Sequence, residues 1–367
     1  MKKAAVIIVT YNAEKYIEPL FESLAKQDYP KDDFRLFLVE NKSEDKTIAE
    51  IKKWVDAEIN RNGSNISNKS NILNKDFLDV EIIENKKNLG FAGGYNVGMN
   101  KSLDRGFDYI VLLNQDMEVD EHWLSEMVKK VESDKSIGAV QSLMLLTKKR
   151  DKINSTGERL NYLGIGYSGN YQLLIINYQP KDNIISYASG AAVLFKSDVL
   201  KRVGLFDESF FMYHEDSDLS WRVRLAGYDI VLADKAIVYH DYKFNRNPKT
   251  FYWTEKNRLT FLLKNFEFKT LVLIFPIFAV MECGMLLHAL VTGWFWQKIK
   301  SYGWVLRNLG NILKSRKEVQ ELRKVRDRDL KKYLVAGIEF GGLENVLLKY
   351  VANPVLKLYW WVVKRLI

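Results

Sequence analysis

Cysteine is almost absent from this chain of 367 residues, because Cys283 is the only one. A single thiol excludes an internal disulfide and a zinc site built from several cysteines, and it is typical of a reducing compartment. An export signal is not recognised either: the apolar run after the first two lysines is only about six residues long, ends in a polar turn and lacks an obvious cleavage site. We therefore expect a protein that works in the cytoplasm.

Most of the chain carries no net positive charge. The net charge is +9, but the stretch from Gln297 to the end holds 16 Lys and Arg against 6 acidic residues, so residues 1–296 are close to neutral. Nucleic acid and an anionic membrane surface would both attract such a tail. The most apolar run of the chain lies directly before it, which favours the membrane and argues against nucleic acid.

The first 240 residues alternate short β-branched runs with amphipathic stretches. This pattern is typical of an α/β fold, in which strands and helices alternate around a mostly parallel sheet. The predicted strands cover residues 4–9, 34–39, 80–83 and 109–113. Ligands of such sheets gather beyond the carboxyl ends of the strands, so the residues after each strand are the first candidates for a site.

Two other segments have little helical periodicity. Asn60 to Lys75 is rich in Asn and Ser and is predicted to be a surface loop without chemistry. Ile153 to Tyr187 has many Tyr, Gly and Asn residues, which favours hairpins or loops that wall a binding site.

Polar groups follow four of the predicted strands, where a nucleotide would need amides, a carboxylate and close backbone approach. Taken singly, each group has a structural interpretation as a helix cap, a turn or a loop. Their placement along one edge of the sheet instead favours a shared ligand. The four groups are Thr10-Tyr11-Asn12, Glu40 to Ser43, Asn88 to Gly94 and Asn114-Gln115-Asp116.

Asp116 and His240 each follow a strand-like run. A carboxylate at such an edge can hold a hard divalent cation that also binds a diphosphate, whereas the structural alternative is that Asp116 caps the helix starting near Asp120. A histidine beyond a strand is more often structural, yet His240 is also a candidate for the second metal ligand.

Three carboxylates lie within four positions at Glu215, Asp216 and Asp218, after an aromatic run. Such crowding is costly unless the groups cap a helix, pair with cations or bind a ligand. Asp216 and Asp218 have a structural interpretation as first-turn carboxylates paired with Arg222 and Arg224. The functional interpretation is that one of the carboxylates is partly desolvated and acts as a general base.

Taken together, these motifs resemble the inverting glycosyltransferases of family 2, which have the GT-A fold, and in particular the rhamnosyltransferase-like and galactofuranosyltransferase-like branch. The similarity spans about residues 4–245 and keeps the order of the family's motifs. The matching segments are Val9 to Asn12, Val39 to Ser43, Asn88 to Asn96, Leu113 to Asp116, Gly190 to Ala192 and His214 to Leu219.

The resemblance implies a role for each matching position. Asp216 matches the catalytic base, while Asp116 and His240 match ligands of Mg²⁺ or Mn²⁺. Asn114 stands where the family's DxD motif has its first Asp, which leaves Asp116 as the firm ligand. The positions implied to bind the donor nucleotide are Thr10, Tyr11, Asn12, Glu40, Asn88, Gly90, Asn114 and Gln115, and those on the acceptor side are Gly190, Glu215 and Trp221.

The implied activity is transfer of a sugar from a nucleotide donor, dTDP-rhamnose or a UDP-sugar, to a glycan or lipid-linked glycan in cell-surface polysaccharide assembly. Two alternatives remain. A sugar nucleotidyltransferase would share the fold and metal, but its Gly-rich, Arg-containing N-terminal loop is not found in the sequence. A membrane-bound adaptor with a degenerate GT-A domain would keep the motifs without turnover. A processive synthase is disfavoured because the sequence has no Q-x-x-R-W motif.

The C-terminal part, residues 246–367, is predicted to be a helical, basic and hydrophobic membrane-associating region. Leu271 to Trp296 is long enough to span a bilayer, although a buried core hairpin is the alternative. A single crossing would place the basic tail outside, against the positive-inside rule. We therefore expect a re-entrant or interfacial hairpin bent near Pro276 and Gly284, at the cytoplasmic face. A second amphipathic surface is predicted at Lys357, Trp360, Trp361, Lys364 and Arg365.

Overall fold

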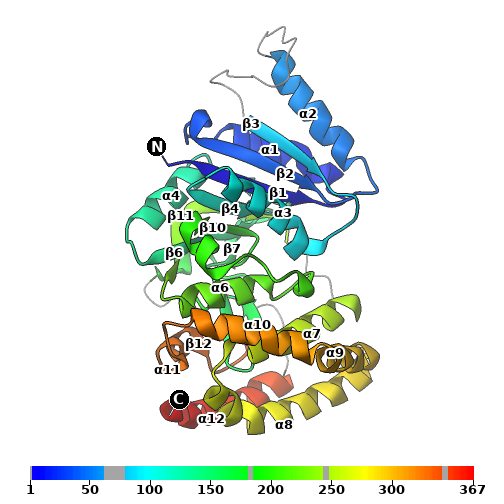
Figure 1. The fold of residues 1–367 in the computed structure, drawn as a ribbon, viewed down its shortest axis with the longest axis vertical. Helices are drawn as coiled ribbons and strands as arrows, with labels where there is room; N and C mark the ends of the chain where they lie inside the picture. The colour runs from blue at the N-terminus through cyan, green and yellow to red at the C-terminus, as the bar shows by residue number, and fades with distance from the viewer. Residues whose placement is uncertain (1, 62–78, 181–184, 243–247, 341–345) are drawn as a thin grey trace.

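Figure 1 shows the computed structural model, which describes residues 2–61, 79–180, 185–242, 248–340 and 346–367. A large twisted sheet with flanking helices forms one end of the molecule, and the helices of the C-terminal region lie together at the other end. Of the polar segment Asn60 to Lys75, the first two residues end a helix, α2 (Thr47–Arg61), and the rest lies outside the described residues.

The four predicted strands are confirmed and lie side by side in parallel, in the order β3, β2, β1, β4. Their apolar residues are buried or half-buried, as expected for side chains that pack on both faces of a covered parallel sheet. Their bounds are β1 (Ala4–Thr10), β2 (Phe34–Glu40), β3 (Asp79–Glu84) and β4 (Tyr109–Leu113).

The sheet continues beyond β4 as a mixed sheet in the order β10, β6, β11, β5. β10 runs antiparallel to both β4 and β6, while β6 and β11 are parallel, so β11 ends at the same edge as β1 and β4. The bounds are β5 (Met117–Val119), β6 (Ile137–Leu146), β10 (Ala192–Lys196) and β11 (Asp229–His240), with β7 (Lys149–Ser155) paired to β6.

Two hydrophobic cores lie on opposite faces of the sheet, because successive side chains of a strand point to opposite faces. On β1, Val6 belongs to one core and Ile7 to the other. The first core includes residues of α1 (Ile17–Ala25), α2 and α4 (Trp123–Glu132), and the second includes residues of α3 (Gly90–Asp104), α5 (Ser197–Val203) and α6 (Glu215–Leu225).

A third core joins the N-terminal region (residues 2–242) to the C-terminal region (residues 248–367). In it Trp221 of α6 packs against Phe261 and Phe266 of α7 (Pro248–Asn265), and Trp360 of α12 (Asn353–Leu366) stacks on Tyr162. A small sheet adds to this junction, formed by β12 (Leu334–Val335), β8 (Glu158–Asn161) and β9 (Gly166–Ser168). The segment from Ile153 to Tyr187 therefore forms strands and turns, as predicted.

The long apolar segment forms one continuous helix, α8 (Phe268–Thr292), so the expected hairpin does not turn near Pro276 and Gly284. The chain reverses later, at Gly293, whose φ of 83° is favourable for glycine, and α9 (Phe295–Arg307) then packs against α8. Pro276 is accommodated within the helix, and the Tyr359 hydroxyl of α12 donates to the carbonyl of Leu273 one turn before it. After α9 come α10 (Leu309–Leu322) and α11 (Asp327–Leu330).

A buried network of charges holds α7, α8 and α9 together. Glu282 of α8 pairs with Arg258 of α7 and with Lys298 of α9, the latter at 2.8 Å, and Glu255 pairs with the same two cations. All four side chains are at most 10% exposed. Glu282 therefore points into the protein and does not interrupt an otherwise apolar face of α8.

Among the described residues, α8 is the one helix whose length and composition are sufficient to cross a membrane. Only 22% of its most apolar window is buried in the protein, which is low for the core helix of a globular domain.

Candidate active site

The carboxyl ends of β1 and β4 are joined by a pair of hydrogen bonds. The backbone N–H of Tyr11 donates to Oε1 of Gln115 at 2.7 Å, and Nε2 of Gln115 donates to the carbonyl of Tyr11 at 3.1 Å. Asn12 lies next to them, where its Oδ1 accepts from the backbone N–H of Glu44 and its own N–H donates to Ser43. Tyr11 is 38% exposed, so it is accessible to a ligand.

Asn41 links the carboxyl ends of β2 and β3. The sequence indicated only that it belongs to a turn. Its Nδ2 donates to Oδ1 of Asn88 at 3.1 Å and to the carbonyl of Gly90 at 3.0 Å, and its Oδ1 accepts from the N–H of Leu89. The carboxylate of Glu40 accepts from the backbone N–H groups of its own turn, at Lys42 and Ser43, and is buried. Asn41 and Glu40 therefore hold the loops at this edge of the sheet in place, in addition to lying at the edge themselves.

Tyr95 of α3 contacts Asn114 and lies close enough to both Asp116 and Glu215 to be affected by their charges. Its hydroxyl donates to Oδ1 of Asn114 at 3.1 Å. Burial raises the pKa of the Tyr95 hydroxyl well above its usual range, and the charges of Asp116 and Glu215 raise it further. Asn114 also donates its N–H to the carbonyl of Ala191, directly after Gly190. The Asp116 and Glu215 groups therefore share one neighbourhood.

Asp116 and His240 are brought together from strand ends far apart in sequence. Nε2 of His240 lies 3.4 Å from Oδ2 of Asp116, and Nδ1 of His240 lies 2.8 Å from Oδ1 of Asn154 on β7. A proton on Nδ1, donated to Oδ1 of Asn154, would leave the Nε2 lone pair for a cation, as in many metal-bound histidines.

The donor set fits Mg²⁺ or Mn²⁺, which bind through one or two protein ligands and keep places for phosphate oxygens. No group of three or more His, Cys, Asp or Glu side chains that could hold a metal occurs in the described part of the chain. The pair Asp116 and His240 would therefore hold a cation together with phosphate oxygens of a ligand.

Asp216 lies in the first turn of α6. Its Oδ1 accepts from the N–H of Ser217 at 2.7 Å and its Oδ2 from the N–H of Gly190 at 3.3 Å. Burial raises the pKa of Asp216 to about 6 despite these hydrogen bonds. Burial and then Asp216 raise the pKa of Glu215 well above its usual range, and Oε2 of Glu215 has no partner within the described residues.

Gly190 is required at its position because of close packing. A Cβ atom there would lie 2.9 Å from the ring of Phe91 and 3.5 Å from Cβ of Asp216. Gly90 is restricted in the same way: its φ is 72°, and a Cβ would lie 2.5 Å from the carbonyl oxygen of Phe211.

The structural interpretation proposed for Asp216 and Asp218, pairing with an arginine, applies to Asp218. It is fully buried, and Oδ2 accepts from Nε of Arg222 at 3.0 Å while Oδ1 accepts from Nδ2 of Asn265 at 2.9 Å. Arg224 does not take part: its guanidinium donates to the carbonyls of Ile185 and Ser186.

Trp221 does not lie on the acceptor side, which corrects that prediction. Its side chain is only 1% exposed and forms part of the core against α7. The helix face that carries it is covered by the C-terminal region, and the spacing of α6 alone gives no sign of this cover. Thr10 is likewise buried, and its hydroxyl has no hydrogen-bond partner within the described residues.

Glu158 and Tyr187 are two site residues that the sequence reasoning missed. The carboxyl of Glu158 accepts from the hydroxyl of Ser155 at 2.7 Å, and its backbone pairs with Tyr187. Burial and then the charge of Asp216 raise the pKa of Tyr187, while burial raises the pKa of Glu158 to about 7. Glu158 lies in a stretch rich in Tyr, Gly and Asn whose sequence has no periodic signal.

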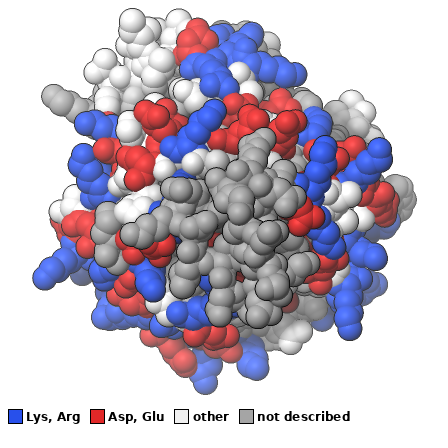
Figure 2. Space-filling view, turned by 90° about the horizontal axis from the view of Figure 1, so that it is seen from above, with Lys and Arg blue, Asp and Glu red and all other residues white. Residues whose placement is uncertain are grey.

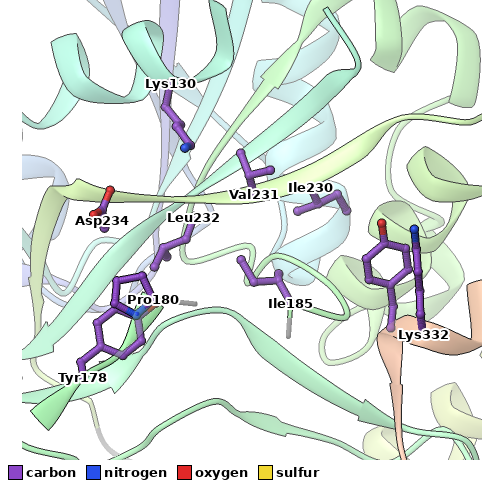
Figure 3. Close-up of a pocket in the computed structure, with 10 residues that line it drawn as sticks. Lys130, Tyr178, Pro180, Ile185, Ile230, Val231, Leu232, Asp234 and Lys332 are labelled. Atoms are coloured by element: carbon purple, nitrogen blue, oxygen red, sulfur yellow. The ribbon is translucent and has the colours of Figure 1, made fainter. Parts of the chain in front are cut away.

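A cavity of about 500 Å³ lies elsewhere in the molecule, around the beginning of β11 (Figure 3). Ile230, Leu232 and Asp234 line it together with Lys130 of α4 and Lys332. His240 lies at the opposite end of β11, so this cavity is separate from the site of Asp116 and Asp216.

A family model described as Glycosyl transferase family 2 matches residues 5–204. The chain belongs to this family. The predicted family and the predicted enzyme class, a glycosyltransferase, are therefore confirmed, whereas the rhamnosyltransferase-like or galactofuranosyltransferase-like branch stays a prediction.

Curated relatives agree with the family. The chain is 25% identical over 223 residues to the low-salt glycan biosynthesis hexosyltransferase Agl10 of Haloferax volcanii, a match covering 60% of this chain and 61% of that protein. It is 48% identical over 54 residues to the poly(ribitol-phosphate) β-N-acetylglucosaminyltransferase TarS of Staphylococcus aureus, covering 15% and 9%. A match to poly-β-1,6-N-acetyl-D-glucosamine synthase of the same organism has 24% identity and covers 61% and 46%. The chain thus matches less than two thirds of each relative.

Solved structures confirm the GT-A fold. A structure of residues 1–349 of S. aureus TarS with UDP-GlcNAc has a TM-score of 0.50 at 18% identity and covers 99% of this chain and 90% of that one. A structure of GalNAc-T7 with UDP, GalNAc and Mn²⁺ has a TM-score of 0.54 at 15% identity, covering 72% and 48%. At these identities the likeness concerns the fold.

Proposed function

We propose that this protein is an inverting glycosyltransferase that moves a sugar from a nucleoside-diphosphate donor to a hydroxyl of a glycan or lipid-linked glycan in cell-surface polysaccharide assembly. The observation that carries the proposal is the state of Asp216. It is buried, makes no ion pair within the described part of the chain, and has its pKa raised to about 6. A carboxylate of that pKa is ionised at neutral pH yet accepts a proton readily, as a general base must.

In the proposed reaction Asp216 takes the proton of the acceptor hydroxyl while that oxygen forms a bond to the anomeric carbon. The bond between the anomeric carbon and the phosphate oxygen breaks, and the nucleoside diphosphate leaves on the opposite face. One displacement therefore inverts the anomeric configuration. Burial raises the pKa of Glu215 beside Asp216, which favours a protonated carboxyl that would donate a hydrogen bond to the acceptor.

Asp116 and the Nε2 lone pair of His240 would hold the cation, Mg²⁺ or Mn²⁺. When bound, it supplies positive charge that stabilises the diphosphate as it leaves. Tyr11, which is exposed at the end of β1, is suited to stack on the base of the nucleotide.

The donor is proposed to be dTDP-rhamnose or a UDP-sugar, in line with the motif resemblance. The test is a panel of nucleotide sugars with Mn²⁺, scored first by thermal shift, because a bound donor stabilises the fold. The donor that stabilises the protein is then incubated with glycan acceptors, and the anomeric configuration of the product is determined by NMR. A product that retains configuration contradicts the mechanism. Stabilisation by a donor without transfer to any acceptor favours the adaptor.

We further propose that α8 and α12 hold the protein at the cytoplasmic face of the membrane, lying in the interface. Both helices expose an apolar face next to basic residues: α12 carries Lys357, Lys364 and Arg365 around an exposed Trp361. Trp360, expected on this surface, is instead buried against Tyr162. The exposed large apolar residues are Phe268, Val272, Phe275, Val280, Leu287, Leu290 and Val291 of α8 and Val355, Leu358, Trp361, Val362 and Leu366 of α12.

The opposite end of the molecule has a different surface. Figure 2 shows that end from above, with Lys, Arg, Asp and Glu distributed over the face that α2 and the sheet occupy. An apolar face flanked by cations at one end, and mixed charges at the other, favours binding to an anionic lipid surface in one orientation.

Flotation with vesicles containing phosphatidylserine tests this proposal. Replacing Phe275, Leu287 and Leu290 by Ser should abolish flotation of the full chain. The matched control replaces Leu174 and Ile176 by Ser, which are exposed apolar residues of the N-terminal region, and should float as the unmodified protein does. If the triple variant floats as well as the unmodified protein does, α8 does not bind the membrane interface as proposed.

A further inference from the structure

The turn before α6 has an unusual backbone. The φ values of Phe211, Tyr213 and His214 are 63°, 67° and 66°. Residues other than glycine rarely adopt such positive φ values. Such residues cost on the order of 1–3 kcal/mol each and persist only where the surroundings hold them. Asp216 follows two residues after His214, so the position of this turn sets the position of the Asp216 carboxylate.

One side chain of the C-terminal region holds the turn. Nδ2 of Asn257, on α7, lies 2.9 Å from the carbonyl oxygen of Phe210, 2.8 Å from that of Met212 and 2.7 Å from that of Tyr213. Asn257 is fully buried. The orientation of its amide is fixed, because the reverse placement would set Oδ1 against three carbonyl oxygens.

The same turn also contacts the donor side of the site. The carbonyl of Phe211 accepts from the N–H of Ala92 at 3.1 Å and lies against Gly90. Lys256, the neighbour of Asn257, donates to the carbonyl of Ser209. The turn is therefore fixed between α7 on one side and the first turn of α3 on the other.

We propose that Asn257 is a positioning residue for the transfer reaction, because its amide fixes the turn that places Asp216 between the acceptor hydroxyl and the donor. This inference rests on the proposed role of Asp216. Asn257 does not act on substrate. It acts through the carbonyls of Phe210, Met212 and Tyr213, which keep the beginning of α6 in place.

The test compares Asn257→Ala with Thr260→Ala. Thr260 is a buried residue one turn farther along α7, whose hydroxyl bonds only within the helix. A displacement of about 1 Å at the reacting groups can cost 10²-fold in rate, so kcat of Asn257→Ala should fall by about 10²-fold per folded molecule. KM for the donor should change less than about threefold, because no donor-binding group is removed. The pH at which kcat is half-maximal on the acid side should also shift, since the surroundings of Asp216 change. Thr260→Ala should retain the kcat and the pH profile of the unmodified protein.

Two results separate this inference from the proposed function. If the unmodified protein transfers sugar, Asp216→Asn does not, and Asn257→Ala keeps its kcat and pH profile, the role of Asn257 is overturned and that of Asp216 stands. If Asp216→Asn remains active, the proposed base is wrong. Should Asn257→Ala not fold, Asn257→Ser, which retains one short donor, is measured in the same way. A loss of folded protein with unchanged kcat per folded molecule would show that Asn257 only stabilises the fold.

Discussion

Buried carboxyl groups behave in opposite ways at two places in the molecule, namely Glu215 and Asp216 at the beginning of α6 and Glu255 at the junction of α7, α8 and α9. At the junction, burial alone would raise the pKa of Glu255, but Arg258 and Lys298 outweigh it and lower the pKa to about 2. At α6, burial raises the pKa of Asp216 and Glu215, and no cation compensates within the described residues. Buried acids with cationic partners stabilise a structure, whereas buried acids without them are available for proton transfer.

The largest expected effect comes from Asp216→Asn. If the unpaired acid is the base, kcat should fall by about 10²- to 10⁴-fold, while donor binding is retained because the amide keeps the shape of the side chain. Initial rates of nucleoside diphosphate release, together with calorimetric titration of the donor, measure both quantities. If the variant retains more than about a tenth of the activity, Asp216 is not the general base, and the proposed difference between unpaired and ion-paired buried acids is wrong.

Glu282→Gln tests the paired acids. The change leaves Arg258 and Lys298 with one carboxylate instead of two, so we expect unfolding to become easier by about 3–5 kcal/mol. Urea denaturation measures this change, and kcat per folded molecule should stay within about twofold. Glu126→Gln, at an exposed pair with Lys129, is the control and should change stability by less than about 1 kcal/mol. Equal effects of the two changes would show that burial does not matter here.

Asn154→Leu tests the candidate metal ligands Asp116 and His240. Removing the acceptor for Nδ1–H should weaken the affinity for Mn²⁺ by about 10- to 100-fold, because the ring loses its fixed orientation. Titration of Mn²⁺ in the presence of the nucleoside diphosphate, followed by electron paramagnetic resonance, gives the affinity. Ser125→Ala, a polar change on α4, is the control. An unchanged affinity would remove His240 from the proposed ligand set.

The smallest expected effect concerns pH and stability. The folded pKa of Asp216, about 6, lies above its value of about 3.8 in the unfolded chain. The folded state therefore binds the extra proton, so Asp216 contributes stability below about pH 4 that is lost as the pH rises through 6. Relative to the unmodified protein, Asp216→Asn should gain on the order of 1–3 kcal/mol at pH 7 and almost nothing at pH 4. Activity of the unmodified protein should fall below about pH 6. A constant difference in thermal stability between the two pH values would contradict the raised pKa.

The sequence predicted those features that depend on local pattern. The strands were recognised because each is a short run of mainly apolar residues, and the carboxyl-end rule for parallel strands then placed Asp116 and Asn12 at one edge. His240 lies more than a hundred residues from Asp116 in the chain, yet the same rule brought it to the right edge.

Features that depend on distant parts of the chain were not predictable in this way. The burial of Trp221 and Trp360 depends on the helices packed over them, and the partners of Glu282 lie on α7 and α9. Glu158 lies in a stretch without periodicity, so the spacing of residues gave no indication that its side chain is buried. Asn257 was not recognised because its role arises from three backbone carbonyls, which carry no sequence signal.

Cys283, the one thiol of the chain, is exposed on α8, one residue after the buried Glu282. The protein therefore already carries a unique attachment point for a maleimide probe on the helix proposed to meet the lipid. A polarity-sensitive dye coupled there would report the immersion depth of α8 by quenching with lipids brominated at known positions, without any substitution elsewhere. The same residue that excluded disulfides thus makes the orientation of the molecule at a bilayer directly measurable.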